Sequence, residues 1–119
     1  MPFLQVTSPS PATPAAIADL AATLARELGL PPDAVVAQWI TTTGTGGGTG
    51  TAEVRGTTRG RDATSRALAA LARRLAETTG APPGHVLATW PTTEPGRSIT
   101  GTGTDLHPAE PATHPGGTA

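Results

Sequence analysis

Two apolar stripes at helical spacing stand out in the pattern of hydrophobic and polar residues. The first consists of Ile17, Leu20, Leu24 and Leu28, and the second of Leu68, Leu71 and Leu75. Residues three or four apart lie on one face of a helix, so each stripe predicts an amphipathic helix. Thr13 and Pro14 are typical of a helix start, and Gly29 and Gly80 of helix ends.

Short runs with strand character precede and follow each stripe. The segments PFLQVTS (2–8) and EVRGTTR (53–59) precede the helices, and AVVAQWITT (34–42) and HVLATWPTT (85–93) follow them. Each half therefore predicts a β-α-β unit with parallel strands and a right-handed crossover. We expect an α+β fold, a tandem β-α-β repeat in which a four-stranded sheet carries two helices on one face.

The two halves are similar to each other in sequence. A shift of 51 residues places GLPPDAVVAQWITT (29–42) on GAPPGHVLATWPTT (80–93), with 8 matches in 14 positions. Repeat one then covers about 2–52 and repeat two about 53–103, which together form one domain over 1–103. Residues 104–119 lack periodicity, and we expect an extended or disordered tail.

Small residues dominate the composition. Ala, Thr, Gly and Pro supply 71 of the 119 residues, whereas Leu, Ile, Val and Phe supply 19. So few large apolar side chains build only a thin core. The sheet face without helices stays open in this arrangement, and we expect it to need a partner subunit. The matched Trp39 and Trp90 are interpreted as packing residues, and GTGGGTG (44–50) as a hairpin or subunit contact.

The charge balance excludes several classes of partner. The net charge is −1, and all eight basic residues are arginine, which argues against nucleic acid and anionic membrane as the main partner.

No cysteine is present, so disulfides and thiolate metal sites are excluded. The histidines, His85, His107 and His114, lack metal-ligand spacing. The sequence contains neither a signal peptide nor a membrane span, so we expect a cytoplasmic protein. We also expect no metal and no cofactor.

Pro2 is the first candidate for chemistry. Met before Pro is normally removed, which leaves Pro2 as a secondary amine at the start of a strand. An α-amino group titrates near about 7.7–8.0, and both burial and nearby cations lower that pKa. Pro2 is therefore a candidate neutral base at physiological pH. Retention of Met1 is the alternative, and it makes the same nitrogen a non-basic amide.

An arginine cluster is predicted to lie beside Pro2. If a pseudo-twofold axis relates the repeats, their first strands run antiparallel, and the start of one lies near the end of the other. The start of the strand over 2–8 then lies near the end of the strand over 53–59, where Arg59 and Arg61 stand, with Arg55 further back. Guanidinium groups bind carboxylates in bidentate fashion. A solvated surface loop is the alternative interpretation of RGTTRGR (55–61).

The same shift also predicts what stands at the opposite end of the sheet. It places Pro2 on Glu53, and it places Arg59 and Arg61 on Ser8 and Ser10. The second site therefore lacks both the amine and the arginines, and only one of the two pseudo-sites is chemically equipped.

Together these features resemble the tautomerase superfamily, which is built on a catalytic amino-terminal proline. The residues that carry the resemblance are Pro2 opening PFLQV, the two β-α-β units, and Gly60-Arg61-Asp62 before the second helix. It implies a trimer in which Pro2 is the base, while Arg59 and Arg61 bind and polarise a small carboxylic acid. The chain departs from the family in lacking tyrosine and a Gly-Arg entry to the first helix.

Three functions follow from these residues and this resemblance. The first is a tautomerase or isomerase acting on small unsaturated 2-hydroxy or 2-keto acids. The second is a dehalogenase, hydratase or decarboxylase of 3-carbon acids, with Glu94 as the first candidate for the water-activating carboxylate and Asp33 as the second. The third is a catalytically silent trimeric scaffold.

Overall fold

The computed structural model describes residues 2–43, 50–56, 59–91 and 102. Each half contains a strand, a helix, a short 3₁₀ turn and a second strand. In chain order the elements are β1 (Phe3–Ser8), α1 (Pro14–Leu28), η1 (Pro32–Ala34), β2 (Val36–Thr41), β3 (Gly50–Arg55), α2 (Arg61–Thr79), η2 (Pro83–His85) and β4 (Val86–Thr89).

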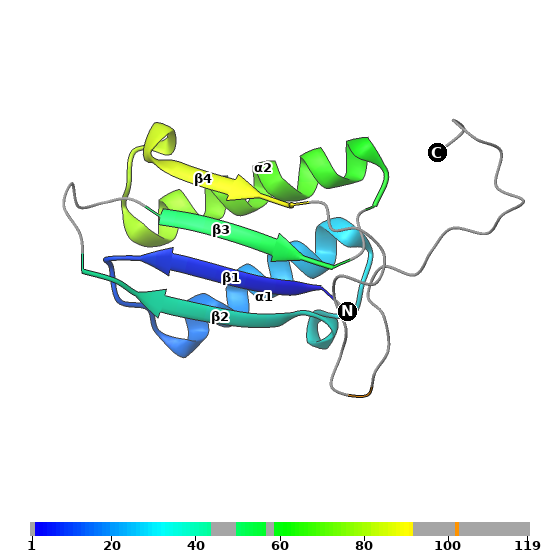
Figure 1. The fold of residues 1–119 in the computed structure, drawn as a ribbon, viewed down its shortest axis with the longest axis horizontal. Coiled ribbons are helices and arrows are strands. Elements are labelled where there is room, and N and C mark those ends of the chain that lie inside the picture. The colour runs from blue at the N-terminus through cyan, green and yellow to red at the C-terminus, as the bar shows by residue number, and fades with distance from the viewer. Residues whose placement is uncertain (1, 44–49, 57–58, 92–101, 103–119) are drawn as a thin grey trace, which may run out of the picture.

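The strands form one mixed sheet in the order β2-β1-β3-β4. Within each repeat the strands are parallel, and the first strands of the two repeats pair antiparallel in the middle. Both helices cover the same face of the sheet (Figure 1). The predicted α+β fold is confirmed, including the antiparallel contact between the first strands.

The helix ends are those that the sequence predicts. The Thr13 side chain accepts a hydrogen bond from the backbone N–H of Ala16 at 3.2 Å, which satisfies one of the free donors at the start of α1. Gly29 and Gly80 have φ values of 69° and 75° at the ends of α1 and α2. This left-handed conformation favours glycine, and the prolines that follow prevent the helices from continuing.

The core lies between the sheet and the helices. Alternate residues of the two central strands face the helices, namely Leu4, Val6, Ala52 and Val54, and all are buried. They pack against the middle of the two apolar stripes, Leu20, Leu24, Leu71 and Leu75. On the helix side that faces away from the sheet, Arg74 pairs with Asp19 and with Glu77, and these interactions raise the pKa of Arg74.

The predicted start of β3 is wrong by three residues. The sequence prediction began this strand at Glu53, but it runs from Gly50 to Arg55 and pairs with β1 over five positions. Its buried residues are Gly50, Ala52 and Val54, which alternate correctly but are too small to give a clear hydrophobic signal. At Gly56 the backbone has a φ of 134°, and the strand ends.

The open face of the sheet carries large apolar side chains at both edges. Val36 and Ile40 of β2 are 44% and 42% exposed, and Leu87 of β4 is 58% exposed. The register places them on the face opposite the helices, together with Phe3 of β1. Polar residues of β1 and β3, such as Gln5 and Glu53, lie between the two edges on this face, and the apolar side chains exposed at each edge favour an interaction surface there.

Candidate functional site

Pro2 lies at the start of β1, which is one of the two inner strands. It is buried, and its carbonyl accepts a hydrogen bond from the N–H of Val36 in β2 at 3.1 Å. The antiparallel register pairs Phe3 with Arg55, so the next position along this register places Pro2 opposite Gly56. Pro2 thus stands at the end of the sheet where β3 finishes.

Trp90 holds the end of β3 next to Pro2. Its indole N–H donates a hydrogen bond to the carbonyl of Gly56 at 3.2 Å, across 34 residues of sequence. The side chain is 8% exposed and belongs to the hydrophobic core. The matched repeat position of Trp90 predicts packing, and the hydrogen bond adds a second contact. The repetition of a tryptophan at equivalent positions is a signal for this hydrogen bond, because packing alone would accept an apolar residue without an N–H donor.

The segment Arg59–Arg61 leads into α2. Gly60 is the N-cap and Arg61 is the first helical residue. Thr64 fixes the segment to the helix, because its N–H donates to the Gly60 carbonyl at 2.9 Å and its hydroxyl donates to the Arg59 carbonyl at 3.2 Å. Both arginines are exposed, and within the described residues neither forms an ion pair.

β1, which follows Pro2, and α2, which follows Arg59 and Gly60, begin at the same end of the molecule (Figure 1). Arg59 comes three positions after Gly56, so the chain allows the two Cα atoms to be at most about 11 Å apart. Two permanent cations at a helix N-terminus create a positive potential there, which favours a bound anion.

Arg55 has a different environment from the other two arginines. Its register opposite Phe3 puts the side chain on the open face of the sheet, where its Nε donates to Glu53 Oε1 at 2.8 Å. This carboxylate already neutralises the guanidinium. Arg55 is therefore less suited to bind a substrate anion than Arg59 or Arg61 within this protomer.

The opposite end of the sheet is the pseudo-site, and its residues differ from those that the 51-residue shift predicted. Phe3 pairs with Val36, and Thr51 pairs with Leu87, which is the counterpart of Val36 under the 51-residue shift. Thr51 is therefore the structural counterpart of Phe3, and the first strands of the two repeats are offset by 48 residues, not 51. Gly50, not Glu53, is consequently the counterpart of Pro2. It stands one position beyond the Thr7–Thr51 pair, opposite Ser8. The segment from there to α1, Pro9–Thr13, contains no arginine.

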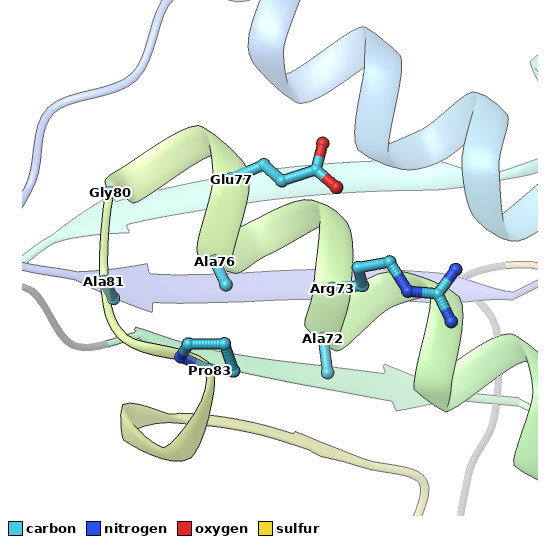
Figure 2. A pocket seen from close by; sticks show the side chains of 7 residues that line it. All are labelled: Ala72, Arg73, Ala76, Glu77, Gly80, Ala81 and Pro83. Carbon is cyan, nitrogen blue, oxygen red and sulfur yellow. The ribbon is translucent and has the colours of Figure 1, made fainter.

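One hollow lined by described residues lies away from this site. It has a volume of about 540 Å³ between α2 and η2, where Arg73, Glu77 and Pro83 surround small alanines and a glycine (Figure 2). A similar hollow of about 530 Å³ lies between α1 and η1. Both are lined by helix alanines and by the first proline of the adjacent 3₁₀ turn, and we attribute both to these small side chains.

Several features that the sequence singles out fall on residues that the structure does not describe. Glu94, the Gly-rich tract 44–49 and the tail 104–119 lie outside the described residues. Among the residues that are described, no group of three or more His, Asp or Glu side chains is arranged to hold a metal ion. In the same part of the chain, no helix has the length and apolar character needed to span a bilayer.

Comparison with known proteins identifies the fold. No protein-family model and no curated protein matches the chain by sequence. Among solved structures, N1, a member of the cis-3-chloroacrylic acid dehalogenase family, is similar with a TM-score of 0.68 and 20% identity, over 89% of this chain and 84% of that one.

Two further structures extend the likeness. The macrophage migration inhibitory factor from Trichinella spiralis has a TM-score of 0.68 and 13% identity, over 87% of this chain and 98% of that one. A fused 4-OT described as a symmetric trimer has a TM-score of 0.64 and 18% identity, over 87% and 95%. The chain therefore has the tautomerase-superfamily fold over nearly the whole length of these proteins, and identities this low show the fold alone.

Proposed function

We propose that this protein is a tautomerase or isomerase that uses Pro2 as a general base on small unsaturated 2-hydroxy or 2-keto acids. The observation that carries the proposal is the buried position of Pro2 at the start of an inner strand, opposite the strand end that leads to Arg59 and Arg61. Removal of Met1 turns the Pro2 nitrogen into a secondary amine, which is basic where an amide is not.

The proposed reaction needs one base and one anion-binding group. The neutral Pro2 nitrogen takes a proton from an enol hydroxyl, or from the carbon next to a carbonyl, and returns it to another carbon of the substrate. Arg59 and Arg61 bind the carboxylate and stabilise the negative charge that develops on the enolate oxygen. These two cations also favour the neutral form of the amine.

The activity is tested with phenylenolpyruvate, whose ketonisation is followed by absorbance. Intact-mass measurement first establishes that Met1 has been removed. We expect Pro2→Ala to lower kcat/KM by about 10²-fold or more, because a positioned general base contributes that much. Pro9→Ala, which changes a proline at the other end of β1, is the matched control and should retain the wild-type rate. Equal rates for Pro2→Ala and wild type would exclude the proposal.

A homotrimer is part of the proposal. It is supported by the open sheet face with its exposed Val36, Ile40 and Leu87, and by the likeness to a structure described as a symmetric trimer. Light scattering should give three times the 11.8 kDa chain mass. Leu87→Arg should reduce this mass because it places a charge on the open sheet face, which the neighbouring protomers cover in the proposed trimer. Ala69→Arg on the exposed side of α2 should leave the mass unchanged. A monomeric wild type would contradict the assembly.

The second candidate is hydrolytic chemistry on 3-carbon acids. The likeness to a member of the cis-3-chloroacrylic acid dehalogenase family, over 89% of this chain, favours it. In that reaction a protonated Pro2 acts as an acid and Glu94 activates water. Chloride release from 3-chloroacrylic acid, lost in Glu94→Gln and retained in Asp33→Asn, would support it over tautomerisation. Absence of both activities with Met1 retained would favour a silent scaffold.

A further inference from the structure

We propose that Trp90 is a positioning residue, whose hydrogen bond to Gly56 fixes the segment Arg59–Arg61 relative to Pro2. The inference rests on the proposed function for its effect on turnover, but its structural part can be measured without any activity. It gives the second tryptophan a task in addition to its packing in the core.

The hydrogen bond joins the last strand of repeat two to the end of its first strand. Trp90 follows β4 directly, and its Nε1 donates to the Gly56 carbonyl at 3.2 Å in a buried setting. Gly56 is itself buried and has a φ of 134°, a conformation that residues with side chains rarely adopt. Without a fixed partner for the Gly56 carbonyl, this peptide could adopt other backbone conformations, because more of them are accessible to glycine than to other residues.

The described residues Gly56, Arg59 and Gly60 are each fixed by a hydrogen bond to their carbonyl. Trp90 holds Gly56 at the start, and Thr64 holds the carbonyls of Arg59 and Gly60 at the end. Exposed arginine side chains have no packing of their own to orient them. Their positions relative to Pro2 depend on the backbone that carries them, and Gly56 is the point where that backbone leaves the sheet opposite Pro2.

Repeat one contains the same device without the chemistry. Trp39 donates from Nε1 to the Ser10 carbonyl at 3.0 Å and so holds the connection between β1 and α1. That connection has no arginine. The chain thus offers a matched control, because the same substitution at Trp39 removes a similar hydrogen bond at the pseudo-site.

Trp90→Phe removes the donor and keeps an aromatic ring. We expect KM for phenylenolpyruvate to rise about 3- to 10-fold, which corresponds to one hydrogen bond of ordinary net strength. Trp39→Phe should change KM less than about 2-fold by the same reasoning, because the bond it removes serves a segment without arginine. Equal effects of the two substitutions would overturn the proposal.

A double-mutant cycle separates positioning from general destabilisation. If Trp90 acts through the arginines, Trp90→Phe should have almost no effect on KM in a chain that already carries Arg59→Gln and Arg61→Gln. If it weakens the whole fold instead, its effect should be the same in both backgrounds. Additive effects would therefore contradict a positioning role.

A folding failure of Trp90→Phe is avoided with an isosteric analogue. The chain has two tryptophans, so residue-specific replacement by benzothienylalanine in the Trp39→Phe background alters Trp90 alone. This analogue keeps the bicyclic shape and replaces the indole N–H with sulfur. It should raise KM as Trp90→Phe does, and an unchanged KM would overturn the proposal.

Hydrogen exchange supplies the readout that does not depend on turnover. Loss of the tether should speed amide exchange in residues 59–64, and Trp39→Phe should leave exchange there unchanged. If phenylenolpyruvate is not turned over by the wild type but this exchange difference appears, the proposed function is wrong and the positioning of the segment stands. Unchanged exchange in residues 59–64 would refute the positioning.

Discussion

The two ends of the central strand pair are built alike and equipped differently. At one end Pro2 lies opposite Gly56, and at the other end Gly50 lies opposite Ser8. Each end has a connection to a helix that a tryptophan holds through a backbone carbonyl. The repeat therefore supplies the same framework twice, and the proposed chemistry depends on a few residues placed on one copy.

The position of Arg61 can be traced to one additional turn of helix. The connections from the first strand to the helix have equal length, five residues in each repeat. However, α2 has 19 residues and α1 has 15, and their C-terminal glycines, Gly29 and Gly80, are 51 residues apart. The additional turn stands at the start of α2. Its first residue is Arg61, where α1 begins with Pro14.

Among the substitutions that test this comparison, the largest effect should come from removing both cations. Arg59→Gln with Arg61→Gln should raise KM for phenylenolpyruvate about 100-fold or more, because each charge-assisted hydrogen bond contributes roughly 1.5–3 kcal/mol. The rising limb of kcat/KM against pH should also move to higher pH. Nearby positive charges disfavour the protonated amine, so their removal raises its pKa.

Arg26→Gln is the control for this pair, because it removes an exposed arginine from the last turn of α1. It should leave KM and the pH profile unchanged. A double variant at Arg59 and Arg61 that behaves like Arg26→Gln would mean that the segment is a solvated loop, and the contrast between the two ends would disappear.

A smaller effect is expected at Gly56. Gly56→Ala places a side chain at a φ of 134° and should lower the free energy of unfolding by about 1–3 kcal/mol. Gly60→Ala is the matched control four residues later, where φ is −56° and an added Cβ meets nothing within 4 Å. Urea denaturation at equal protein concentration measures both. Equal stability of the two variants would contradict the strained geometry.

The smallest effect should come from the pseudo-site. A Cβ added at Gly50 lies 3.2 Å from Leu75 Cδ2, so the leucine must shift by a few tenths of an ångström. Gly50→Ala should lower the free energy of unfolding by about 1 kcal/mol and leave kcat/KM unchanged. A large loss of activity in this variant would show that the two ends are not functionally distinct.

Sequence reasoning could predict those parts of the fold that have local physical signals. Leu20, Leu24, Leu71 and Leu75 lie in the core because their spacing places them on one helix face. Gly29 and Gly80 end the helices because the left-handed conformation favours glycine. The antiparallel pairing of β1 with β3 followed from the symmetry of the repeat.

Two parts of the site could not be predicted in the same way. The position of β3 depends on five pairs with β1, and the small residues Gly50 and Ala52 gave little local signal. The bond between Trp90 and Gly56 joins residues 34 apart and depends on how β4 packs beside β3. The clustering of Arg59 and Arg61 indicates an anion-binding role that stays a prediction, and the 51-residue offset gives no sign of the additional helix turn that begins with Arg61.

The central claim is that a free Pro2 nitrogen is the base, and blocking that nitrogen tests it most directly. One additional residue before Pro2, verified by intact mass, converts the amine to an amide while every other side chain is kept. The account predicts that phenylenolpyruvate ketonisation falls by about 10²- to 10⁴-fold relative to the chain with Pro2 exposed as its first residue. Equal rates in the two chains would contradict it.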